Sequence, residues 1–70
     1  MEQKTVNMTE AGRRLVKLRG IRTRSGVSRE TGIPYSTLQA YEEGRRQPCG
    51  QTKKKLADYY GVPVEFIFYT

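Results

Sequence analysis

The chain has 70 residues, enough for one small domain but too few for a sizeable catalytic cleft, since a domain of this length buries only about 60% of its unfolded surface. Thirteen Lys and Arg against seven Asp and Glu give a formal net charge of +6, which favours nucleic acid as a partner over an acidic protein or a membrane. The chain lacks histidine, any Ser or Cys beside a base in a recognised spacing, and any metal-ligand cluster, so we expect neither an enzyme nor a bound metal or cofactor.

The first predicted helix follows a polar segment. Residues 1–8 show no periodicity and are expected to be flexible, so that the folded domain spans residues 9–70. Thr9 can act as the N-cap of a helix, and Gly20 provides its stop. One apolar stripe, repeating at intervals of four and three residues, comprises Ala11, Leu15 and Leu18.

Two short helical patterns, which together span about residues 24–43, meet at Gly32. Thr23 is a candidate N-cap for the first, and Pro34 presets the backbone for the second. A steep crossing of two helices needs a small residue on the first helix, here Ser28, and a corner residue that can adopt a positive φ, here Gly32. The apolar residues that would close the angle are Val27, Ile33, Leu38 and Tyr41.

The rest of the chain predicts a loop, a fourth helix and a short last turn. The loop, residues 44–51, is rich in Gly and Pro. A helix follows over about residues 52–60, with lysines 53–55 spread around its outer side, and Pro63 starts an apolar last turn. No stretch alternates as a strand does, so the predicted fold is all-α with five helices.

The second helix of the motif, about Tyr35 to Glu43, is expected to present a polar face. At about 100° per residue, the residues that share the inward side are Ile33, Leu38 and Tyr41. The residues expected to read base edges in the major groove are Tyr35, Ser36, Gln39 and Ala40. Gln39 can pair with adenine N6 and N7, a contact worth about 1–3 kcal/mol of discrimination, and the Ala40 methyl can pack on a thymine methyl. Glu43 shares this face and would point, unfavourably, toward an acidic ligand.

Phosphate contacts are expected around this face. Thr23 and Arg24 open the first helix of the motif, whose N-terminal amides suit an anion. Arg45 and Arg46 follow the second helix and can straddle the edge of the groove. The alternative interpretation is an ordinary solvated surface for all of these residues, and the surrounding motif favours DNA contact.

Three segments of the sequence resemble those of a known protein family. LVKLR near the start, GIPYSTLQAYEEGRRQP in the middle and KLADYYGVPVEFIF near the end resemble a Cro/C1-type (lambda-repressor-like, XRE) helix-turn-helix domain. The resemblance runs from about Ala11 to Phe68, and the E-x-G-R-x-x-P run is its most specific part. Two departures stand out: the link at residues 20–22 is about two residues shorter than usual, and Lys53 occupies a position that is usually apolar.

The resemblance implies roles for individual residues. It implies a compact five-helix fold in which Arg19 and Glu42 form a partly buried pair. In similar proteins the positions of Tyr35, Ser36 and Gln39 are among those that touch base edges. The position of Arg24 is often a glutamine bound to the DNA backbone.

These observations favour a sequence-specific transcriptional regulator, acting as a repressor of phage or mobile-element type on a double-stranded DNA operator. The alternative is a protein-interaction module on the same fold, an antirepressor or antitoxin subunit. RNA binding is a third option, but no aromatic platform for stacked bases is evident beyond Tyr35.

Self-association and location follow from other features. The aromatic residues near the end either fill the core or form a dimer patch, and we expect a homodimer on DNA because one short helix reads too few base pairs for genomic specificity. Cys49 is a single cysteine, which suits a reducing cytoplasm, and neither a signal peptide nor an apolar run of about 20 residues is evident. We therefore expect a cytoplasmic protein, bacterial or phage-encoded, that is associated with the nucleoid.

Overall fold

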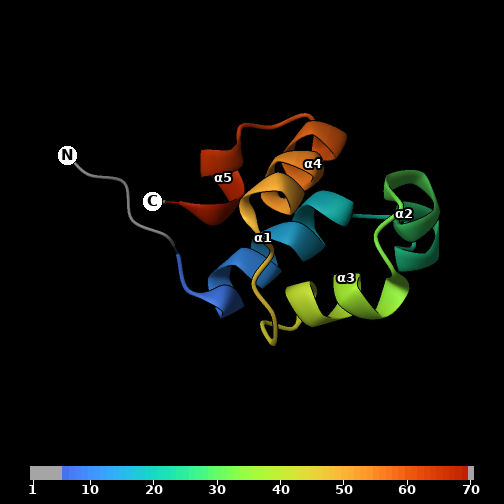
Figure 1. Cartoon of the computed structure of the whole chain (residues 1–70), viewed down its shortest axis with the longest axis horizontal. Coiled ribbons are helices and arrows are strands. Elements are labelled where there is room, and N and C mark those ends of the chain that lie inside the picture. Colours follow the sequence, from blue (N-terminus) through green and yellow to red (C-terminus); the bar gives the residue numbers. More distant parts are fainter. Residues whose placement is uncertain (1–5, 70) are drawn as a thin grey trace.

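The computed structural model describes residues 6–69, and within them the chain forms an all-α fold, as predicted (Figure 1). Its helices are α1 (Met8–Arg19), α2 (Arg24–Thr31), α3 (Tyr35–Glu42), α4 (Gly50–Tyr60) and α5 (Val64–Phe68). Helix α1 runs through the middle of the molecule and contacts both α3 and α5, which lie on opposite sides of it (Figure 1). Helix α2 contacts α3 and α4 at the other end. This arrangement leaves the outer side of α3 uncovered by another helix.

The folded part of the chain starts earlier than expected. The N-cap of α1 is Asn7, whose side-chain oxygen accepts a hydrogen bond from the Glu10 amide at 2.8 Å, so the prediction of Thr9 as the cap is wrong. Val6 is buried, and its amide donates to the Phe68 carbonyl at 2.9 Å. Ordered contacts therefore include Val6, Asn7 and Met8, which had been assigned to the flexible segment. The rest of that segment, residues 1–5, lies outside the described residues.

The core lies between the helices and takes buried side chains from the motif as well as from α1, α4 and α5. Its largest fully buried side chains are Phe68, Leu56, Ile67 and Val27. Of the predicted stripe on α1, Ala11 and Leu15 are buried and Leu18 packs against the core while partly exposed. The buried cluster draws side chains from all five helices, so these short helices depend on one another for burial rather than on their own propensity.

Lys53 departs from the expected pattern. The predicted solvated position is wrong, since Lys53 is buried on the inner side of α4. Its Nζ lies 5.4 Å from the ring centroid of Phe68 and 5.1 Å from that of Tyr69. A lysine can occupy this usually apolar position because its hydrocarbon stem packs like an aliphatic side chain while the ammonium group meets aromatic faces.

Two contacts of α1 position the other helices. Gly12 faces the end of α3 so closely that a Cβ built on it would lie 2.4 Å from the Glu42 carbonyl oxygen. On the other side, Arg14 Nη1 donates to the carbonyl oxygens of Phe66, Ile67 and Tyr69 at 3.2, 3.3 and 3.1 Å. The guanidinium thereby satisfies carbonyl groups at the end of α5 that have no partner within so short a helix.

Candidate nucleic-acid interface

The corner between α2 and α3 has the predicted construction. Thr23 caps α2, its hydroxyl oxygen accepting from the Gly26 amide at 3.0 Å. Gly32 ends α2 with φ of 78°, and the Ser28 hydroxyl donates to the Ile33 carbonyl at 2.6 Å. A Cβ on Gly32 would meet nothing within 4 Å, so glycine is needed there for its backbone conformation and not for space. The corner thus fixes the direction in which α3 leaves α2.

One side of α3 is locked into the core and the other is presented to solvent. The predicted inward residues Ile33, Leu38 and Tyr41 are all buried. On the opposite side, Tyr35 and Ser36 are exposed and Gln39 is partly exposed. The side chains at these three positions therefore extend from a helix that is held rigidly from behind.

Ala40 does not belong to this outward set, and the expectation that its methyl meets a base is wrong. Ala40 is only 6% exposed. The chain after Gly44 turns back over the end of α3, where the amides of Arg45 and Arg46 both donate to the Ala40 carbonyl, at 2.8 and 3.3 Å. Helical spacing assigns Ala40 to the outward set with Gln39, but its short side chain is buried, as are those of Leu38 and Tyr41 on the same helix.

The predicted pair of Arg19 and Glu42 is present and has a third member. Glu42 Oε2 accepts from Arg19 Nε at 2.9 Å, and Oε1 accepts from Arg24 Nε at 2.7 Å. The Glu42 side chain is 3% exposed, so one buried carboxylate joins the end of α1, the start of α2 and the end of α3. Hydrogen bonds to Glu42 and then to Tyr35 raise the pKa of Arg24 above its usual value. Arg24, expected at a phosphate, therefore has its Nε committed to the fold.

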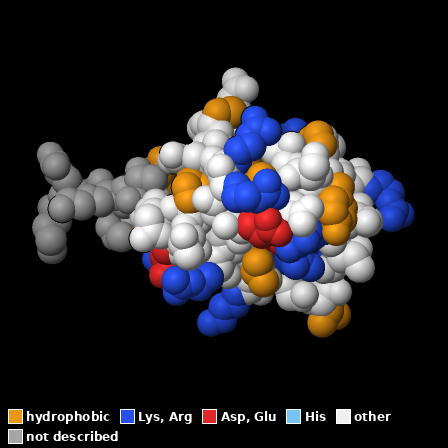
Figure 2. Space-filling model, turned by 90° about the horizontal axis from the view of Figure 1, so that it is seen from below, with side chains coloured by type: hydrophobic (Ala, Val, Ile, Leu, Met, Phe, Trp, Pro, Cys, Tyr) orange, Lys and Arg blue, Asp and Glu red, His pale blue; other side chains and the backbone are white. Residues whose placement is uncertain are grey.

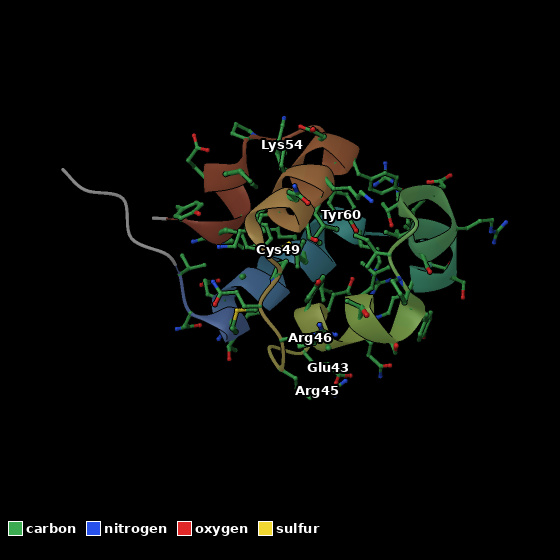
Figure 3. All side chains as sticks on the ribbon, in the orientation of Figure 1. Glu43, Arg45, Arg46, Cys49, Lys54 and Tyr60 are labelled. Carbon is green, nitrogen blue, oxygen red and sulfur yellow. The ribbon has the colours of Figure 1, made fainter. Side chains whose placement is uncertain are left out.

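A second, exposed network occupies the end of α3. Glu43 Oε2 accepts from Gln39 Nε2 at 3.0 Å, and Oε1 accepts from Arg45 Nε at 2.8 Å. The hydrogen bond from Gln39, followed by that from Arg45, lowers the pKa of the Glu43 carboxyl, which therefore stays ionised at neutral pH. Figure 3 shows Glu43, Arg45 and Arg46 together at the end of α3, where the chain leaves the helix.

The surface around α3 is mostly basic. Figure 2, which views the molecule from the side on which α3 lies, shows several Lys and Arg side chains around a small acidic group. Arg45 and Arg46 are both exposed there. Positive charge around a polar helix suits a duplex, since phosphates flank the groove that the helix would enter.

Two residues important to this arrangement carried no strong signal in the sequence. In the sequence, Gly12 is a glycine within a predicted helix and nothing near it signals a close contact. The carbonyl groups that approach it belong to residues about 30 positions further along the chain. For Glu43 the sequence predicts an outward position and no role, and its spacing of four from Gln39 is the one sign of a helical side-chain pair.

The fold and the corner define a class of DNA-binding regulator, and comparison with known proteins agrees. The family model described as Helix-turn-helix matches residues 13–67, and the chain belongs to this family, of the Cro/C1 (XRE) type. A curated relative, the cryptic phage CTXphi transcriptional repressor RstR of Vibrio cholerae, is 36% identical over 53 residues, which cover 69% of this chain and 48% of the relative. The chain thus spans about half the length of the curated relative it matches. No solved structure matches the chain.

Two further features concern membrane-spanning helices and metal-binding clusters among the described residues. Between residues 6 and 69, no helix is long and apolar enough to cross a membrane. Over the same range, no three Cys, Asp or Glu side chains gather in a way that could hold a metal ion.

Proposed function

We propose that this protein is a sequence-specific transcriptional repressor of phage or mobile-element type, which acts in the bacterial cytoplasm by inserting α3 into the major groove of an operator. The observation that carries the proposal is the outward presentation of Tyr35, Ser36 and Gln39 from a helix whose other side is buried. Membership of the helix-turn-helix family and likeness to a phage repressor support it. The second helix of this motif is the one that enters the groove in DNA complexes.

Each exposed side chain of α3 has a role in this proposal. Gln39 reads adenine through its side-chain amide, and Ser36 donates to or accepts from a neighbouring base edge. Tyr35, 46% exposed at the start of the helix, lies at the rim and contacts the edge of the site. With Ala40 buried, Gln39 becomes the principal base-reading residue.

The phosphate contacts come from both sides of α3. Arg45 and Arg46 bind the backbone beyond the end of the helix. At the start of α2, Thr23 binds through its hydroxyl hydrogen, since its oxygen already caps the helix, and Arg24 binds through guanidinium N–H groups other than Nε. Arg24 is therefore the weakest of these contacts.

Selection of bound sequences from a random DNA pool, followed by a salt titration on the selected site, tests the proposal. About five neutralised phosphates per subunit predict a slope of log K against log salt near −4.5 per subunit. Gln39→Ala is expected to relax the preference at one base pair of the half-site, by about 1–3 kcal/mol of discrimination. Arg46→Ala is the matched control and should weaken binding to all sites alike.

Two results would contradict this assignment. Equal losses at every site for both variants would remove the base-reading role of Gln39. Affinity that is weak, flat with salt and indifferent to sequence would instead favour the protein-interaction function, as an antirepressor or antitoxin subunit.

The repressor is proposed to bind its operator as a homodimer through the α1–α5 side. Phe66 is 59% exposed there. It lines a hollow of about 580 Å³ together with Arg14, Lys17, Leu18, Glu65 and Tyr69. Acidic and basic side chains in one hollow allow two copies related by a two-fold axis to pair with each other, as a symmetric dimer requires. Two recognition helices reading half-sites about 34 Å apart then supply the specificity that a single helix lacks.

Phe66→Ser is expected to weaken binding to the full palindrome roughly tenfold, because it removes an aromatic anchor, while leaving affinity for an isolated half-site unchanged. Titrations on full-site and half-site duplexes measure the two affinities, and sedimentation of the free protein measures its self-association. Val16→Ser is the control, since Val16 is 41% exposed on α1 but does not line the hollow. A loss at the half-site equal to that at the palindrome would speak against a dimer role for Phe66.

A further inference from the structure

We infer that Glu43 is a specificity-determining residue: its carboxylate fixes the side-chain amide of Gln39 in the orientation that accepts adenine and rejects guanine. The inference rests on the proposed function, and it assigns to an acidic residue of the DNA-facing surface a role in choosing the base.

The first step is the geometry of the free protein. Gln39 Nε2 lies 3.0 Å from Glu43 Oε2, one helical turn further along, and Glu43 Oε1 is held by Arg45 Nε at 2.8 Å. An ionised carboxylate only accepts hydrogen bonds, so it must face the NH₂ group of the amide and not its carbonyl. Because Arg45 anchors the other oxygen, the carboxylate is held in position to keep the Gln39 amide from flipping.

The second step is the edge that this bond leaves for a base. One of the two N–H groups of Gln39 Nε2 is used by Glu43, so Gln39 presents one donor and one acceptor. Adenine offers the complementary pair in the major groove, N7 as acceptor and N6–H as donor. Guanine offers two acceptors, N7 and O6, and the Gln39 carbonyl would face O6 without a hydrogen between them. Without its hydrogen bond to Glu43, the Gln39 amide could turn both N–H groups toward guanine. The Glu43 carboxylate is therefore what makes Gln39 discriminate between adenine and guanine.

The third step is charge. The Glu43 side chain is 42% exposed beside Arg45, whose side chain is 60% exposed, on the surface that would meet phosphate. The carboxylate neutralises Arg45 locally, which weakens phosphate attraction that carries no sequence information. Glu43 therefore lowers non-specific affinity while it orients the residue that reads a base.

Two substitutions separate these effects. Glu43→Gln removes the charge but keeps a carbonyl that can accept from Gln39, whereas Glu43→Ala removes both. Glu43 is exposed and has right-handed helical backbone angles, so both variants are expected to fold. They are compared with the unmodified chain on duplexes that carry A or G at the base pair that Gln39→Ala relaxes.

The unmodified chain should prefer adenine over guanine by roughly fivefold to a hundredfold, the range expected for one good bidentate contact. Glu43→Ala should reduce this preference to about threefold or less. Glu43→Gln should give an intermediate preference, because its amide can face Gln39 with either its carbonyl or its NH₂ group. Both variants should steepen the slope of log K against log salt by up to about 0.9 per subunit, because each removes the negative charge that offsets Arg45 beside the phosphates.

A measurement without DNA tests the orienting contact directly. The side-chain NH₂ resonances of Gln39 in the free protein should move most in Glu43→Ala and by a smaller amount in Glu43→Gln, which can still accept from them part of the time. Unmoved resonances in Glu43→Ala, or a purine preference that this variant leaves intact, would overturn the inference while the proposed function stands. If the unmodified chain shows no base preference at all, the proposed function and this inference fall together.

Discussion

Replacing Gly12 with alanine is expected to destabilise the fold by about 2–3 kcal/mol and to weaken DNA binding with it. The added Cβ would lie 2.4 Å from the Glu42 carbonyl oxygen and 2.9 Å from that of Tyr41, and both are backbone atoms that no side-chain rotation can move away. Overpacking typically costs about 1–3 kcal/mol and occasionally more. A contact of 2.4 Å with a backbone oxygen belongs at or above the top of that range, so the loss outweighs the 0.5–1 kcal/mol or so that alanine gains over glycine within a helix. The melting temperature should fall by about 10 °C or more in a domain of this size.

Gly50→Ala is the matched control for Gly12→Ala. Gly50 opens α4, has no positive φ, and a Cβ there would meet nothing within 4 Å. The melting temperature of the Gly50→Ala variant is expected to equal that of the unmodified chain or to be slightly higher. Since Gly12 sets the separation of α1 and α3, its variant should also lose affinity for the selected operator under conditions where it is still folded. A Gly12→Ala protein as stable as Gly50→Ala would contradict the close approach of the two helices.

Removing the Glu42 carboxylate should have an effect of similar size for a different reason. Glu42→Ala leaves the guanidinium groups of Arg19 and Arg24 close together without the acid that both contact. Breaking a fully buried ion pair costs about 3–5 kcal/mol, and we expect about 2–4 kcal/mol here because the two arginine side chains are 18% and 23% exposed. A domain of this length is stable by only about 4–10 kcal/mol, so urea unfolding should show a large fall in the midpoint.

Glu43→Ala provides the comparison at the next position. Its ion pair with Arg45 is exposed on both sides, and such pairs contribute about 0–1 kcal/mol. Glu42→Ala should therefore unfold at much lower urea than Glu43→Ala, although each removes one glutamate from the same end of α3. Equal midpoints for the two variants would show that the buried carboxylate does not join the three helices as described.

The corner of the motif could be predicted because its signals are local. Thr23 as a cap, Gly32 at a positive φ and the apolar residues of α3 all depend on interactions within a few residues, and the structure has each of them in place. The pairing of Arg19 with Glu42, which are 23 residues apart, was available only through the resemblance to a family.

Errors arose where a distant segment decides the environment. Ala40 is a different case, because helical spacing predicts an outward position and its short side chain is nevertheless buried within α3. The sequence predicts a solvated Lys53, but its side chain is buried and its Nζ lies against the rings of Phe68 and Tyr69. The start of the domain was set at Thr9, since nothing in the sequence revealed that Val6 pairs with Phe68 at the other end of the chain.

By itself, the sequence determined an all-α domain of positive charge, with two helices meeting at a glycine and a polar side on the second. Helical periodicity, capping and glycine conformation act over a few residues and can be read directly from the order of the amino acids. The tertiary structure decided which of the outward positions are open, how closely α1 approaches α3 at Gly12, and which partners Glu42 and Glu43 bind. The contacts of Gly12 and Glu42 join segments far apart in the chain and form only when the helices pack, whereas Glu43 bonds to residues four and two positions away at the end of α3.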